Sequence, residues 1–126
     1  MIDNIEQVGR LLPKLLASLP LQAILTPELA ACMQKDAPEH DVPQHCDIVD
    51  ISYAGYEGGI MCKLVLTGPG GERVFYVSIT HLTFHRRHPL AREIAAYQKH
   101  RIKRMRIVDA DRPSEGKRTV VVRKVA

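Results

Sequence analysis

The residues best suited to chemistry gather between positions 81 and 106, where histidine, lysine and arginine are concentrated. From Arg86 to Arg106, eight lysines and arginines stand against one acid, Glu93. At about 100° per residue, half of these cations fall in one row about 21 Å long on a single helix face: Arg92, Lys99, Lys103 and Arg106. A solvated helix face usually mixes the two signs of charge in pairs four residues apart. The pattern therefore predicts a surface that binds a polyanion or an acidic protein. The alternative is a solvated helix face whose charges all have the same sign.

The start of the same helix has the residue types of an anion site. Pro89 suits the first helical position, where its missing N–H has no intrahelical partner. No Ser, Thr, Asp or Asn directly precedes it to cap the free N–H groups, and Arg86, Arg87 and His88 stand there instead. Free N–H groups beside cations favour a phosphate or a sulfate. The alternatives are a cap from Thr83, from water or from another loop, or a helix that begins elsewhere.

The histidines offer weaker grounds for a reaction. His81 and His85 would lie about 13 Å apart along a strand, too far to share a metal ion. His81-Leu82-Thr83 resembles one half of the paired His-x-Thr motif of the two-histidine phosphoesterases, in which one histidine acts as base and the other as acid. The chain has no second copy of that motif. We therefore predict no catalytic residue, no metal site and no cofactor.

Composition places the chain among soluble globular proteins of ordinary size. Of its 126 residues, 45% are hydrophobic and 25% are charged. The three cysteines, Cys32, Cys46 and Cys62, are too few for a disulfide framework and favour a reducing, cytoplasmic compartment. Prolines and a lysine interrupt the apolar run from Leu11 to Leu25, so neither a membrane span nor a membrane partner is expected.

The charge is divided unevenly along the chain. Residues 1–57 carry nine acids and three bases, whereas residues 58–126 carry five acids and fifteen bases. A chain of this kind either folds its acidic half onto its basic half or presents a basic face outward, and the sequence leaves both open.

The first 35 residues are predicted to be helical. Asp3 in the N-cap role and Glu6 have the spacing of a capping box, and leucines follow at helical spacing to about position 19. Pro13 should kink this helix or split it. A second, short helix is expected from Thr26 to Lys35. The leucine-rich first helix serves either the core or the interface of a homodimer.

The segment 45–84 is predicted to form an antiparallel sheet. Its expected strands, joined by glycine-rich turns into a three-strand meander, are 48–54, 60–67 and 73–84. The first should place Val49, Ile51 and Tyr53 on one face. The second alternates as a half-buried strand, with one face made of Ile60, Cys62, Leu64 and Leu66.

The long basic helix is expected at 88–108 and a final strand at 118–125. The order of elements predicts a single α+β domain over residues 1–126, with helices on one face of the sheet. Over about residues 26–107 this order is similar to that of the double-stranded-RNA-binding domain. Ala91-Arg92 followed by Ala95-Ala96 resembles the Ala-Lys-x-x-Ala-Ala of that family's second helix, although His88-Pro89 replaces the preceding lysine pair. The resemblance implies binding to RNA.

Three hypotheses on function follow. The leading one is a small non-catalytic module that contacts the phosphate backbone of RNA or DNA, or an acidic protein surface, through the row of four cations, with Arg86, Arg87 and His88 extending the site. The alternative is a protein–protein adaptor or homodimer that uses the leucine-rich first helix. The third is an enzyme that acts on a small phosphorylated substrate at the start of helix 88–108.

Overall fold

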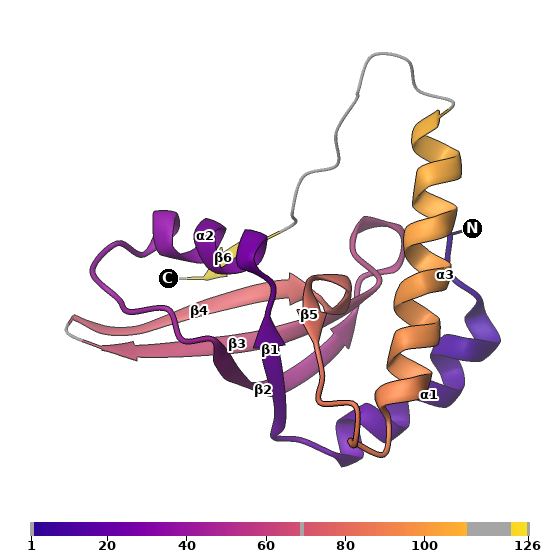
Figure 1. Cartoon of the computed structure of the whole chain (residues 1–126), viewed down its shortest axis with the longest axis horizontal. Helices are drawn as coiled ribbons and strands as arrows, with labels where there is room; N and C mark the ends of the chain where they lie inside the picture. The colour runs from indigo at the N-terminus through magenta and orange to yellow at the C-terminus, as the bar shows by residue number, and fades with distance from the viewer. Residues whose placement is uncertain (1, 69, 111–121, 126) are drawn as a thin grey trace.

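The computed structural model describes residues 2–68, 70–110 and 122–125, and it confirms the mixed α+β class (Figure 1). The helices are α1 (Ile5–Ala17), α2 (Pro27–Asp36) and α3 (Ala91–Ala110), with two 3-10 turns, η1 (Gly55–Glu57) and η2 (Ile79–His81). The strands are β1 (Leu21–Leu25), β2 (His45–Tyr53), β3 (Ile60–Gly68), β4 (Gly71–Ser78), β5 (Leu82–Thr83) and β6 (Val122–Val125). None of the helices in the described part of the chain is long and apolar enough to cross a membrane.

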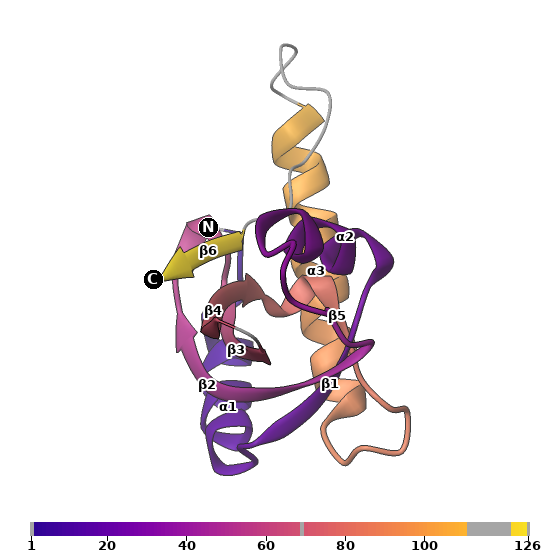
Figure 2. The same cartoon turned by 90° about the vertical axis from the view of Figure 1, so that its left-hand side faces the viewer.

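The strands form one antiparallel sheet in the order β5-β1-β2-β3-β4-β6. Only the turn η2 connects β4 to β5, although β1, β2 and β3 lie between these two strands in the sheet. So short a connection requires the sheet to curl until its two sides approach each other, as Figure 2 shows. The backbone N–H and the hydroxyl of Thr26 both donate to the His81 carbonyl, at 3.4 and 3.0 Å, and so fix the end of β1 to the turn that leads into β5.

A β-bulge in β2 changes which residues face inward. Ile48 pairs with Leu64, but Asp50 pairs with Lys63, so Val49 is the extra residue between them. Val49 is accordingly 44% exposed, although the alternation predicted it on the same face as Ile51. The face prediction for this strand was therefore wrong at Val49, because simple alternation takes no account of a bulge.

The inner face of the sheet and one side of each helix enclose the hydrophobic core. The predicted inner face of β3 is confirmed, since Ile60, Cys62, Leu64 and Leu66 are all buried. The helices add buried side chains from α1 (Val8, Leu11, Leu15), α2 (Leu29, Met33) and α3 (Ile94, Tyr97). Most of the predicted leucines of α1 thus serve the core.

The N-terminal part is not helical throughout, as residues 1–35 were predicted to be. It contains β1, which pairs with β2 on one side and with β5 on the other. Leu21, Ala23 and Leu25 are buried, while Gln22 between them is exposed. This alternation is the signal of a strand, but five residues are too few for it to stand out from an apolar run. The short helix after it is confirmed at Pro27–Asp36, with the Thr26 hydroxyl accepting from the Leu29 N–H at 3.4 Å.

The predicted strand 73–84 is two strands on opposite sides of the sheet. The Ser78 hydroxyl accepts a hydrogen bond from the Thr80 N–H at 3.3 Å, which caps η2 and ends β4. The chain then turns back, and β5 pairs with β1 instead of extending β4. A run that is apolar on both faces does not show where such a turn interrupts it.

Several predicted boundaries also differ. Asn4, not Asp3, caps α1, because its side-chain oxygen accepts from the N–H groups of Glu6 and Gln7 at 3.0 and 3.2 Å. The helix continues through Pro13 without the expected split. The long helix occupies 91–110 instead of 88–108, and the last strand is described at 122–125, with 118–121 outside the described residues.

Candidate anion-binding surface

The helix α3 lies against the core along one face and leaves its opposite face exposed. It runs beside α1 in the opposite direction, and the Lys14 ammonium meets the Glu93 carboxylate at 2.8 Å. On its inner face, the Gln98 amide donates to the carbonyls of Ile79 and Leu82, both at 2.7 Å. These bonds fix α3 to the turn η2, so its outer face has a defined orientation. The last turns of the helix project beyond the sheet (Figure 1).

The predicted row of cations lies on the outer face of α3. Its four members, Arg92, Lys99, Lys103 and Arg106, are all exposed. Among the residues that the structure describes, no salt bridge involves any of these four side chains. Glu93, the one acid in the predicted basic segment, is instead held by Lys14. The acidic N-terminal half therefore does not cover the row in the described structure.

The segment before α3 is a tight turn held by histidine rings. The His85 Nδ1 accepts from the Arg87 N–H, and the His88 Nδ1 accepts from the Leu90 N–H, both at 3.1 Å. The Ala91 N–H donates to the His88 carbonyl at 3.0 Å. The helix therefore begins at Ala91, later than expected, and the ring and the carbonyl of His88 hold the turn that precedes it. Pro89 lies in this turn and not at the first helical position.

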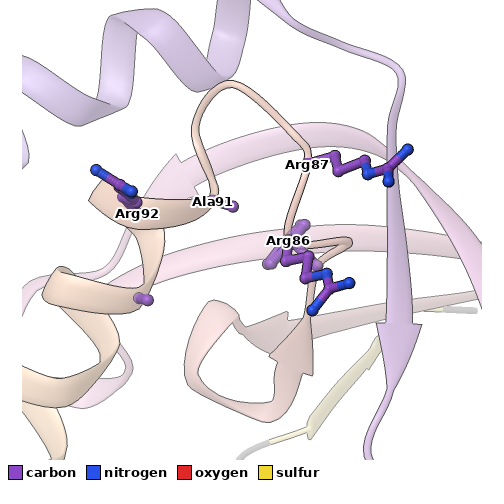
Figure 3. A pocket seen from close by; sticks show the side chains of 6 residues that line it. Arg86, Arg87, Ala91 and Arg92 are labelled. Atoms are coloured by element: carbon purple, nitrogen blue, oxygen red, sulfur yellow. The ribbon is translucent and has the colours of Figure 1, made fainter.

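An open hollow of about 690 Å³ lies beside this turn and the first turns of α3 (Figure 3). Its lining comes from two neighbouring segments of the chain: Phe84, Arg86 and Arg87 before the helix, and Ala91, Arg92 and Ala95 on it. The three guanidinium groups point in different directions and not toward one centre (Figure 3). Three of the predicted residues, Arg86, Arg87 and Arg92, thus line one hollow, while His88 belongs to the turn beside it.

One basic residue of α3 has a different environment from the row. Arg101 is 1% exposed, and its guanidinium donates to the Asp3 carboxylate at 3.0 Å and to the Tyr56 carbonyl at 2.9 Å. The other oxygen of Asp3 accepts from the hydroxyls of Tyr53 and Tyr97, at 3.0 and 2.8 Å. We call Asp3, Tyr53, Tyr97 and Arg101 the buried polar cluster. It joins the N-terminus, β2 and α3.

The buried polar cluster holds its two tyrosines in the neutral form. Burial and the hydrogen bond to the Asp3 carboxylate raise the pKa of Tyr53 to about 12, and the same two causes raise the pKa of Tyr97. Gly59 makes room for the cluster, because a Cβ there would meet the Tyr97 hydroxyl and lie 2.9 Å from Asp3 Oδ2. Sequence reasoning missed this cluster, since its partners lie up to 98 residues apart.

Cys46 and Cys62 are buried thiols. Burial raises the pKa of the Cys62 thiol, and burial with the nearby Asp47 carboxylate raises that of Cys46. Raised pKa values keep these thiols protonated and unreactive at neutral pH. Within the described ranges, no three His, Cys, Asp or Glu side chains gather as they would around a metal ion.

Comparison of the chain with protein-family models, with curated proteins and with solved structures finds no significant match.

Proposed function

We propose that this protein binds the phosphate backbone of a nucleic acid through the outer face of α3 and the turn before it. The observation that carries the proposal is the exposed row of cations that, in the described structure, has no carboxylate partners and continues through Arg92 into the hollow with Arg86 and Arg87. Lysines and arginines in such a row neutralise phosphates and release counterions, which supplies affinity without reading sequence.

The shape of the site favours an extended polyanion over a small phosphorylated substrate. A site for one phosphate group would direct several donors at a single point. The guanidinium groups of Arg86, Arg87 and Arg92 diverge instead, so each suits a different phosphate along a chain. The row of cations beyond them, about 21 Å long, likewise exceeds what one small molecule spans. We therefore rank backbone binding above an enzyme for a small phosphorylated substrate.

The burial of α1 weakens the case for an adaptor or homodimer built on that helix. Val8, Leu11 and Leu15 are enclosed in the core. Among the described residues of α1, Ile5 and Leu16 are the large apolar side chains that are exposed, and they stand at opposite ends of the helix. A stable interface needs a continuous apolar centre, which two separated side chains do not provide.

The test is binding of labelled duplex RNA and duplex DNA between about 50 and 200 mM salt. The variant Lys99→Gln/Lys103→Gln removes two charges from the row. The control, Arg10→Gln/Lys35→Gln, removes two exposed charges from α1 and α2 and gives the same net charge. We expect wild type and control to bind alike. The row variant should bind more weakly, and its log–log salt slope on DNA should be shallower by about two units, or about 0.9 per lost contact.

Two results would overturn the proposal. One is no binding by the wild type at about 50 mM salt, where backbone contacts are strongest. The other is an equal loss in both double variants, which would show attraction by net charge and no particular surface.

A further inference from the structure

We propose that the hollow beside the start of α3 receives one unpaired nucleotide of the bound strand, with its base against Phe84 and its flanking phosphates on the surrounding arginines. This inference rests on the proposed function. It adds a preference that the row of cations cannot supply, because contacts to phosphates alone do not distinguish paired from unpaired strands.

The apolar lining of the hollow is the first reason to expect a base there. Phe84 is partly buried, packs against the hydrophobic core and also lines the hollow. Ala91 and Ala95 line the same hollow, and their small side chains add apolar surface to it. Phosphates gain nothing from such an apolar lining, whereas a flat base stacks on an aromatic ring whatever its sequence. A hollow of about 690 Å³ also lies within the usual size range of ligand pockets.

The arrangement of the arginines around the hollow is the second reason to expect a nucleotide there. Arg86 and Arg87 lie on the tight turn that the rings of His85 and His88 hold, and Arg92 lies across the hollow on α3. Their guanidinium groups point away from one another and not toward a common centre (Figure 3). Guanidinium groups that diverge in this way suit separate phosphates, such as those on either side of one nucleotide whose base enters the hollow.

The hollow and the row share Arg92, so one strand is able to occupy both. A base inside a duplex must first leave its stack and its pair, which costs free energy, whereas an unpaired base does not carry this cost. The hollow should therefore favour a duplex with a single-stranded extension over the same duplex with blunt ends.

The experiment compares two RNA duplexes of equal sequence, one blunt and one with a short single-stranded extension that carries the fluorescent base 2-aminopurine. We expect the wild type to bind the extended duplex about tenfold more tightly than the blunt one, which is at the low end of the effect of stacking one base on an aromatic ring. Stacking on Phe84 should quench the 2-aminopurine fluorescence.

Two variants test the hollow in different ways. Phe84→Leu keeps an apolar side chain against the core but removes the aromatic ring. Ala95→Leu fills the hollow from an exposed helix position and leaves the charges unchanged. Both should abolish the tenfold preference and the quenching, while the affinity for the blunt duplex stays at the wild-type value.

The outcomes separate this inference from the proposed function. Equal binding of blunt and extended duplexes by the wild type, or a preference that survives in both variants, would overturn the inference and leave backbone binding standing. No binding of either duplex at low salt would overturn both.

Discussion

Arg101 and Lys103 are two residues apart on α3, yet they have opposite environments. Arg101 is enclosed in the buried polar cluster, where its charge meets the Asp3 carboxylate and a backbone carbonyl. Lys103 is exposed, and no salt bridge of the described structure involves it. The buried cation is part of the fold, whereas the exposed one is available to a partner. A count of basic residues in a sequence does not separate these two roles.

The buried and the exposed charge should differ in how much stability the protein loses when each is removed. A charge in the buried polar cluster should be costly to remove, because its partner would stay buried without compensation. A charge of the exposed row should cost nothing to remove, since water already solvates it and its neighbours on the helix are cations.

Replacing Asp3 should cause the largest loss of stability. Asp3→Ala leaves the Arg101 charge and two tyrosine hydroxyls without their common acceptor, and we expect the free energy of unfolding to fall by about 3–5 kcal/mol. Urea denaturation measures this. The control is Glu93→Ala, which breaks the exposed pair with Lys14 and should cost less than about 1 kcal/mol. Similar losses in the two variants would contradict the distinction between buried and exposed charges.

Gly59→Ala should disturb the same cluster from the backbone side. Gly59 has a φ of +66°, and an added Cβ would meet the Tyr97 hydroxyl. Together the left-handed conformation and the displaced hydroxyl should lower the free energy of unfolding by about 2–4 kcal/mol.

Gly9→Ala in α1 is the matched control for that glycine. A Cβ at Gly9 would meet no atom within 4 Å, and the residue lies inside a helix. This variant should therefore be more stable than the wild type by about 0.5–1 kcal/mol. A loss of stability at both positions would mean that the close approach at Gly59 is not the cause.

High pH should weaken the buried polar cluster through Tyr53. The pKa of Tyr53 rises from an ordinary value of 10.0 to about 12 in the folded protein, so the folded state holds the phenolic proton more tightly. The corresponding stabilisation is fully present below pH 10 and is lost as the pH rises from 10 toward 12. The stability difference between the wild type and Tyr53→Phe, from urea denaturation at several pH values, should narrow over that interval. A stability difference between the two proteins that stays constant up to pH 12 would contradict the prediction.

The parts of the structure that sequence predicted are those that depend on local periodicity. Alternation in β3 and the two faces of α3 both follow from residues close together in the chain, and the structure has both. The mixed α+β class follows in turn. The same periodicity places Arg92 and Lys99 on one face of the helix, whereas the sequence left open whether that face is exposed.

The parts that sequence missed depend on long-range contacts or on single turns. Asp3 has the spacing of a capping residue, and nothing local shows that its carboxylate meets Arg101 instead. The break between β4 and β5 depends on the Ser78 hydroxyl, and the turn that delays the start of α3 to Ala91 depends on the ring of His88. Gly59 was the one available signal for the cluster, since a glycine can mark a close approach of the backbone.

The smallest expected effect is a gain in stability when Lys103 is replaced. Lys103 lies four residues after Lys99 and three before Arg106, so it has a like charge on each side along the helix. It also lies more than one turn from the end of α3 at Ala110, too far to gain much from the helix dipole. Lys103→Gln should therefore raise the free energy of unfolding by about 0.5 kcal/mol at low salt, and by less at high salt, where the repulsion is screened.

Lys35→Gln is the control for this gain and should have the opposite sign. Lys35 stands in the last turn of α2, where a cation complements the dipole, so its removal should cost about 0.3–1 kcal/mol. Urea denaturation of both variants at about 50 mM and 1 M salt makes the comparison. A loss of stability in Lys103→Gln would show that this lysine supports the fold, as Arg101 does. A gain, together with weaker binding of duplex RNA by the row variant, would mean that the exposed cations are kept for binding at a small cost in stability.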